Sequence, residues 1–209
     1  MLGSLVKHLL RPRESVAVQP EVDPTTPLRL HIGGQEPHPD WKIVNVTPGE
    51  HTDYVRSCTD LSPFASGTVA EIYASHVLEH LGYQRELATA LAEFHRVLVP
   101  GGTLRASVPD LATLCTMFFD PSFAPKDRLH VMRLMFGGQL DENDFHYVGL
   151  YEELMVSHLQ HAGFADIVRV ESLGLFVDAS CVHFHGRAIS LNVIARKPPV
   201  AASRPCRPR

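Results

Sequence analysis

Hydrophobic residues fall into short runs along the chain, and Gly, Pro and polar residues separate these runs. Apolar runs of this length, bounded by turn residues, predict buried β-strands. The runs lie at 28–34, 41–46, 53–57, 70–75 and 103–109, and two further runs at 166–172 and 188–197 predict two closing strands.

Between these runs the hydrophobic positions recur at helical spacing. Leu87, Leu91 and Phe94 fall on one side of a helix, and Pro100 begins the Pro-Gly-Gly run that should end it. Asp110 is suited to cap the next helix. The helices are expected at 83–99, 111–119, 125–136 (beginning at Pro125) and 150–164.

Strands that alternate with helices predict an α/β protein with a doubly wound, mostly parallel sheet. Such sheets bind ligands beyond the carboxyl ends of their strands. The residues that directly follow the predicted strands are therefore the first candidates for chemistry: Gly33, Gly34, Gln35, Thr47, Asp60, Leu61, Ser75, His76, Pro109 and Asp110.

Composition narrows the class of protein. The chain has 209 residues, of which 44% are hydrophobic and 20% charged, as in a single globular domain. A net charge of -4 argues against an extended nucleic-acid interface. The four cysteines are scattered, which favours reduced thiols in a cytosolic, cytoplasmic protein. No apolar run approaches the roughly 18 residues of a membrane span.

The two ends differ from the domain that we expect at 28–197. Residues 1–27 combine an apolar, basic stretch with a Pro-rich one, which predicts a short amphipathic helix and a linker, with no signal peptide. That helix either packs on the domain or docks on a membrane surface or a partner. Residues 198–209 form a basic, Pro-rich tail that we expect to be disordered.

The stretch His76-Val77-Leu78-Glu79-His80 has the H-x-x-E-H pattern of inverted zinc peptidases. Glu152 or Glu153 would be the third ligand. A zinc site of this kind needs both His rings on one helix face. His76 directly follows an apolar strand, so we expect it in the loop before the helix, and we predict no metal at His76 and His80. Glu79 and His80 are then expected to begin a helix, with Leu78 and Leu81 packing inward.

Three longer segments resemble class I S-adenosylmethionine-dependent methyltransferases. They are "TDLSPFASGTVAEIYASHVLEHL" (59–81), "EFHRVLVPGGTLRASVPD" (93–110) and "HYVGLYEELMVSHLQHAGF" (146–164), and the resemblance covers roughly 28–196. It implies a Rossmann-like fold whose last strand is antiparallel. It also implies an enzyme that uses S-adenosyl-L-methionine to methylate a small or polar acceptor, a small molecule or a glycan, with O-methylation favoured.

The resemblance assigns cofactor contacts to the residues after the strands. Gly33 and Gly34 would approach the cofactor, although Gln35 leaves the family's G-x-G incomplete. Thr47, with Asn45 nearby, stands where the family has an acidic residue for the ribose. The resemblance further implies that the Asp60 carboxylate accepts from the adenine amino group, that the Leu61 backbone meets the ring, and that Ser75 and His76 border the methionine half.

The acceptor side is expected at the polar stretch before the last helix. There the resemblance implies that His146 acts as a base in the cleft, with Asp144 and Tyr147 contacting the substrate and His76 as the other base candidate. The departures at Gln35 and Thr47 leave open a catalytically silent module that binds or scaffolds. A nicotinamide-dependent enzyme would need G-x-G-x-x-G and an acidic residue after the second strand, and both are missing. The sequence leaves a homodimer open.

Overall fold

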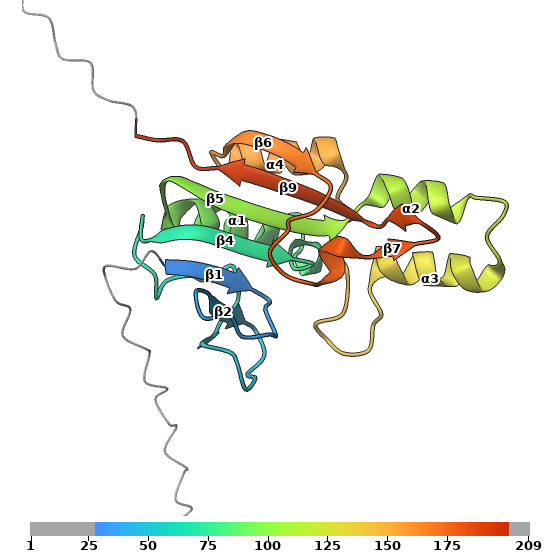
Figure 1. Ribbon diagram of the computed structural model, residues 1–209, viewed down its shortest axis with the longest axis horizontal. Helices are drawn as coiled ribbons and strands as arrows, with labels where there is room; N and C mark the ends of the chain where they lie inside the picture. Colours follow the sequence, from blue (N-terminus) through green and yellow to red (C-terminus); the bar gives the residue numbers. More distant parts are fainter. Residues whose placement is uncertain (1–27, 201–209) are drawn as a thin grey trace, which may run out of the picture.

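The computed structural model describes residues 28–200 (Figure 1). The expected N-terminal helix and linker (1–27) and most of the expected tail (201–209) lie outside the described residues. The strands are β1 (Leu28–Ile32), β2 (Lys42–Asn45), β3 (Tyr54–Val55), β4 (Val69–Ser75), β5 (Leu98–Pro109), β6 (Ala165–Val170), β7 (His183–Phe184), β8 (Arg187–Ala188) and β9 (Ser190–Arg196). The helices are α1 (Glu86–Val97), α2 (Leu111–Phe118), α3 (Pro125–Phe136) and α4 (Glu152–His161), with 3-10 turns η1 (Leu78–His80) and η2 (Ala179–Cys181).

Seven strands form one sheet in the order β3-β2-β1-β4-β5-β9-β6. From β3 to β5 every neighbouring pair is parallel. The last strand, β9, lies between β5 and β6 and is antiparallel to both. The predicted fold class, a mostly parallel α/β sheet with an antiparallel last strand, is confirmed.

The centre of the sheet is apolar because its strands are covered on both faces. In β4, Ile72, Tyr73 and Ala74 are fully buried, and β5 buries Leu104 beside Ile72 in the same register. Central parallel strands are expected to read as continuous hydrophobic runs for this reason. The long strand β5 starts at Leu98, earlier than predicted, because Gly101 and Gly102 already exchange backbone hydrogen bonds with Lys197.

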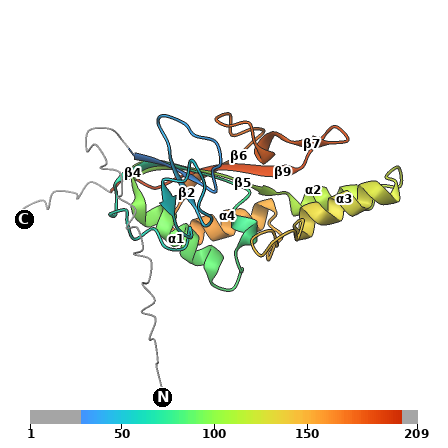
Figure 2. The same ribbon diagram turned by 90° about the horizontal axis from the view of Figure 1, so that it is seen from below.

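The two faces of the sheet are covered differently (Figure 2). Helix α1 packs on one face through Leu87, Leu91 and Phe94, and α4 lies on the same face. The other face is covered by connections without α-helices, the one between β1 and β2 and the one that follows β6. Aromatic side chains cover the sheet there, since Phe176 packs against Trp41 and Tyr73.

Helices α2 and α3 extend beyond the ends of the strands (Figure 1). They have a small core of their own around Leu114, Val131 and Ile189. Helix α3, which precedes His146, therefore packs mainly on α2. The expected cap is present, since the Asp110 carboxylate accepts hydrogen bonds from the backbone N–H groups of Ala112 and Thr113. Within residues 28–200, no helix has the length and apolar character needed to cross a bilayer.

Candidate active site

A cavity of about 460 Å³ opens at the carboxyl ends of the strands β1, β2 and β4. This is the position where open α/β sheets bind their ligands. Its wall includes Gly33, Asn45, Thr47, Ser57, His76 and His80, and the polar connection after α3 closes it with Asp141, Glu142, Asn143, Asp144 and Tyr147. The volume lies within the range of pockets that enclose small-molecule cofactors.

Each of the two glycines after β1 leaves space for a different neighbouring side chain. Gly33 has a φ of 72°, and a Cβ atom there would stand 2.6 Å from the Val77 Cγ2 atom. Only glycine suits this turn, which brings backbone to the cavity wall. Gly34 does not line the cavity. A Cβ atom at Gly34 would meet the His31 ring at 2.6 Å, so this glycine makes room for the buried histidine.

The end of β2 carries neutral groups. The Asn45 amide donates to the Gly34 carbonyl (3.2 Å), and its oxygen accepts from the Thr47 backbone N–H and hydroxyl, both at 3.2 Å. Both side chains therefore hold the wall in place while they face the cavity. The acidic lining comes instead from the connection after α3, at Asp141, Glu142 and Asp144.

Asp60 does not line the cavity, contrary to the prediction. Its carboxylate accepts from the Ser62 backbone N–H (3.1 Å) and pairs with Arg56 (2.9 Å). These contacts lower the pKa of Asp60, the Ser62 hydrogen bonds most and Arg56 less. Because β3 has only two residues, the cavity wall is reached already at Arg56, Ser57 and Cys58.

Leu61 is also placed differently from the prediction. Its side chain is fully buried in the main core. Its backbone N–H, which we expected at the adenine ring, donates to the Glu93 carboxylate at 2.9 Å. The chain after Cys58 therefore turns away from the cavity, and Leu61 enters the core.

His76 lies where the sequence predicts it, directly after β4 and before η1. Its φ is 53°, the left-handed region that a residue with a side chain seldom adopts. Its backbone N–H donates to the Ser107 carbonyl at 2.8 Å. Ser75, its neighbour, does not line the cavity.

The His76 ring is held in one orientation. The Ser190 hydroxyl donates to the Ala179 carbonyl, so its oxygen accepts from the His76 Nε2–H at 2.9 Å. The lone pair is then on Nδ1, which lies 3.3 Å from the Glu79 Oε1 atom. Burial lowers the pKa of His76 to about 4, with Asp178 opposing this shift, so the ring is neutral near pH 7.

His146 does not point into the cavity, which corrects the prediction. Tyr147 lines the cavity, and in an extended chain the residue before it faces the other way. The Tyr147 N–H donates to the Glu79 carbonyl at 2.8 Å, which fixes this alternation. The His146 ring packs edge-on against the His80 ring, with 4.8 Å between the centroids.

Asp144 lines the cavity as predicted, but its carboxylate also shapes the loop. One oxygen accepts from the Gly138 N–H and the other from the Leu140 N–H, both at 3.2 Å. The loop residues Asp141, Glu142 and Asn143 are exposed and keep their side chains available at the rim. The acceptor side of the cavity is therefore polar.

Sequence reasoning missed His80 and Glu79. We expected them to begin a helix, but they belong to the single turn η1, and α1 begins only at Glu86. His80 lines the cavity. Glu79 is 1% exposed, and burial raises its pKa to about 8. Glu152, the third ligand of the peptidase hypothesis, instead pairs with Arg169 at 2.9 Å.

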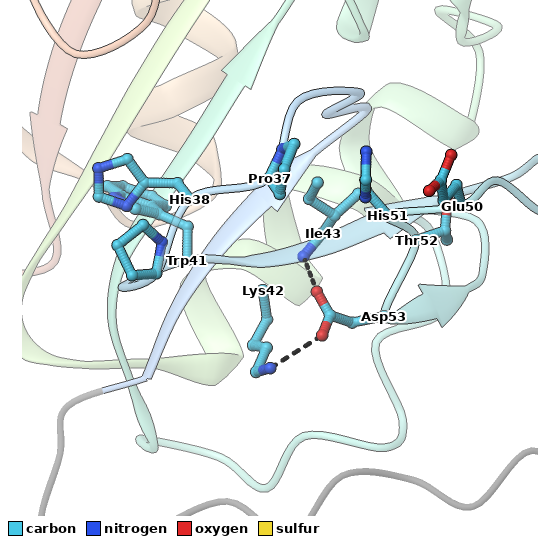
Figure 3. A pocket seen from close by; sticks show the side chains of 10 residues that line it. Pro37, His38, Trp41, Lys42, Ile43, Glu50, His51, Thr52 and Asp53 are labelled. Atoms are coloured by element: carbon cyan, nitrogen blue, oxygen red, sulfur yellow. Dashed lines mark hydrogen bonds and ion pairs between the residues drawn. The ribbon is translucent and has the colours of Figure 1, made fainter.

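A second hollow, of about 520 Å³, lies at the amino ends of β2 and β3 (Figure 3). There the Asp53 carboxylate accepts from the Lys42 ammonium and from the Ile43 backbone N–H, both at 2.8 Å. Both carboxylate oxygens are thus used to join β2 to the chain before β3. Open α/β sheets bind their ligands at the carboxyl ends of the strands, whereas this hollow lies at the amino ends.

Residues 42–106 match the family model of the methyltransferase domain. Among solved structures, the fold is similar to a S-adenosylmethionine-dependent methyltransferase from Archaeoglobus fulgidus (TM-score 0.51, 15% identity, 83% of this chain and 87% of that one). It is also similar to a possible histamine N-methyltransferase from Thermotoga maritima (TM-score 0.50, 15% identity, 81% of each chain).

A third similar structure is a possible exported protein from Bordetella parapertussis (TM-score 0.51, 15% identity). The match covers 82% of this chain but only 62% of that one, so the present chain spans about three fifths of its length. No curated protein matches the sequence significantly. At such identities the structures show a shared fold and nothing of the substrate.

The strand order, the antiparallel β9 and the family match define a class I methyltransferase fold. Residues 42–106 match the methyltransferase domain, and the fold is that of S-adenosylmethionine-dependent methyltransferases, a class whose cofactor is S-adenosylmethionine. The cavity suits this cofactor: Gly33 brings backbone close, and Asn45, Thr47 and Ser57 offer neutral hydrogen-bonding groups. These residues would hold the nucleoside half.

Proposed function

We propose that this methyltransferase methylates an oxygen atom of a small, polar acceptor such as a polar metabolite or a glycan. S-adenosylmethionine supplies a methyl group on a reactive sulfonium, so the main task of the chain is to position the acceptor in line with it. The exposed side chains of Asp141, Glu142 and Asn143 at the cavity support a hydroxyl-rich acceptor, because carboxylate and amide oxygens accept hydrogen bonds from hydroxyl groups.

The observation that carries this proposal is the placement of His76. A left-handed backbone at a residue with a side chain costs about 1–3 kcal/mol and is concentrated at functional sites. The strained backbone and the hydrogen bond to Ser190 hold a neutral imidazole in the cavity wall. The Nδ1 atom, which keeps the lone pair and lies 3.3 Å from the Glu79 Oε1 atom, would be the atom that takes the proton a hydroxyl loses during methyl transfer. His146, which packs behind this wall, is not needed for that step.

The test separates binding from proton transfer with two variants and one control. His76→Gln and His76→Ala should bind S-adenosylhomocysteine within a fewfold of the wild-type affinity, measured by calorimetry. Methyl transfer from radiolabelled S-adenosylmethionine should fall by about 10²-fold or more. The matched control is His161→Gln, on the exposed surface of α4, and it should change neither quantity.

The acceptor is sought with a panel of polyhydroxylated compounds, amines and thiols. We expect product only with hydroxyl compounds. Transfer to an amine or a thiol would contradict the oxygen assignment. Absence of S-adenosylhomocysteine binding at millimolar concentration would favour the catalytically silent module instead.

A further inference from the structure

Three side chains that could hold a metal ion meet beside the cavity. Glu79 and His80 come from η1, and His146 comes from the connection between α3 and α4. One ligand atom from each lies within 4.8 Å of the others. This cluster differs from the H-x-x-E-H hypothesis, because His146 takes part and His76 does not.

Both histidines are oriented as metal ligands usually are. The His80 Nδ1 atom lies 3.1 Å from the Phe145 carbonyl oxygen, and the His146 Nδ1 atom lies 3.1 Å from the Leu134 carbonyl oxygen. A carbonyl oxygen can only accept, so each Nδ1 carries the proton and each Nε2 keeps its lone pair. Outer hydrogen bonds of this kind fix the tautomer of metal-bound histidines.

The buried side chain of Glu79 is a second observation that points to a cation, and it is independent of the orientation of the histidines. Its side chain is 1% exposed, and within residues 28–200 neither carboxylate oxygen has a hydrogen-bond partner. The His76 Nδ1 atom, at 3.3 Å from Oε1, is close but does not form a hydrogen bond with it. A buried carboxylate without a partner is costly, and a cation bound beside it would remove much of that cost.

We propose that Glu79, His80 and His146 bind one divalent first-row transition-metal ion of the zinc type. Two imidazole nitrogens and one carboxylate favour zinc or its neighbours over magnesium and calcium, which prefer oxygen ligands. Zinc bonds of about 2.0–2.1 Å place tetrahedral ligand atoms roughly 3.3 Å apart. The side chains therefore have to close by about 1–1.5 Å around the ion.

The ion would join two parts of the cavity wall. His80 lines the cavity, and Tyr147, next to His146, lines it as well. Binding would hold the connection between α3 and α4 against η1, so its backbone should exchange hydrogen more slowly with the ion present. This inference does not depend on which acceptor the enzyme uses or on whether His76 is the base.

Metal binding is measured on the full chain purified without a histidine tag and stripped with a chelator. Calorimetry with Zn²⁺ should give one equivalent, and Co²⁺ should give the visible absorption of a tetrahedral site. His146→Ala and Glu79→Gln should each weaken binding by about 10²-fold or more, because each removes one of three ligands. Thermal unfolding of each variant establishes that it is folded.

The control is His183→Ala, an exposed histidine next to Cys181 that could bind metal adventitiously. It should bind Zn²⁺ like the wild type. Binding that survives in both cluster variants, or that is lost in His183→Ala, would overturn the proposal. So would far less than one equivalent of zinc in the folded wild type. If Glu79→Gln fails to fold, His146→Ala, which alters a half-buried side chain, still decides the question.

Discussion

At the scale of single residues, Gly33 and Gly67 allow a matched comparison. Both have a positive φ, 72° and 70°, but only Gly33 has a close neighbour at the position of a Cβ atom. Gly67→Ala should cost about 1–2 kcal/mol of unfolding free energy through the backbone alone. Gly33→Ala should cost about 1–3 kcal/mol more, because its methyl group meets Val77. Urea unfolding measures both.

A second substitution shows whether that extra cost comes from the contact. In the Gly33→Ala, Val77→Ala double variant the clash is removed, so the two changes should cost less together than the sum of each alone. Strict additivity would mean that Val77 is not the obstacle. Binding of S-adenosylhomocysteine should also weaken in Gly33→Ala but not in Gly67→Ala, which lies outside the cavity.

His31 predicts a pH dependence of stability. Its ring is buried between Phe176 and Tyr73, and burial lowers its pKa to about 4, against the opposing effect of Asp178. Between pH 6.5 and 4 the unfolded chain binds a proton here that the folded chain does not. Falling pH therefore removes stability on the order of 2–3 kcal/mol, which is fully present above pH 6.5.

His31→Phe isolates this contribution from other histidines that titrate in the same range. The His31 Nδ1 atom has no hydrogen-bond partner within residues 28–200, so phenylalanine loses none there. The difference in unfolding free energy between wild type and variant should change with pH from 6.5 to 4. A constant difference would mean that His31 is protonated in the folded protein.

At the scale of elements, the carboxyl end of α1 is bound by the side chain of Lys197, which directly follows the distant strand β9. The Lys197 ammonium donates to the carbonyl of His95, in the last turn of the helix, and to that of Leu98, which directly follows it, both at 2.7 Å. A cation there satisfies terminal carbonyls and the helix dipole. Lys197→Met should lower the unfolding free energy by about 1–3 kcal/mol. Lys126→Met, at an exposed position in α3, should stay within about 0.5 kcal/mol.

The sequence predicted the elements that local pattern controls. Pro125 begins α3 and Asp110 caps α2, as their chemistry requires. The wrong predictions concern segments whose structure depends on contacts with residues remote in sequence. Leu78 to His80 form only one turn, because the Glu79 carbonyl accepts from the Tyr147 backbone, which is remote in sequence. No local pattern around Glu79 contains that partner.

The contrast between local pattern and remote contacts also explains which residues of the candidate site could be predicted. Gly33, Thr47 and His76 line the cavity because parallel strands bring their carboxyl ends to one edge of the sheet, a rule that needs only the ends of the predicted strands. Asp60 is misplaced because the length of β3 decides which later residue reaches the edge. The cluster of Glu79, His80 and His146 depends on a loop path that the sequence pattern does not encode.

At the scale of the whole molecule, the loop after β6 covers the face of the sheet on which residues 28–200 place no α-helix. Its Phe176 packs on Trp41, the single tryptophan of the chain, with 5.6 Å between ring centroids. Phe176→Ala should shift the tryptophan emission to longer wavelength and cost about 2–4 kcal/mol of unfolding free energy. Phe119→Ala, at a residue 79% exposed, is the control and should change neither. An unchanged emission in Phe176→Ala would show that the loop does not shield Trp41.

The position of β9 also has a consequence for the order of synthesis. Among the strands of residues 28–200, β9 is synthesised last, yet it lies between β5 and β6. Until β9 is added, one edge of β5 and the facing edge of β6 are unpaired, and β9 pairs both of them in the finished sheet. Such edges invite pairing with other chains. A ribosome that stalls before Ser190 therefore displays an aggregation-prone product, and rare codons just upstream of β9 should lower the yield of folded protein.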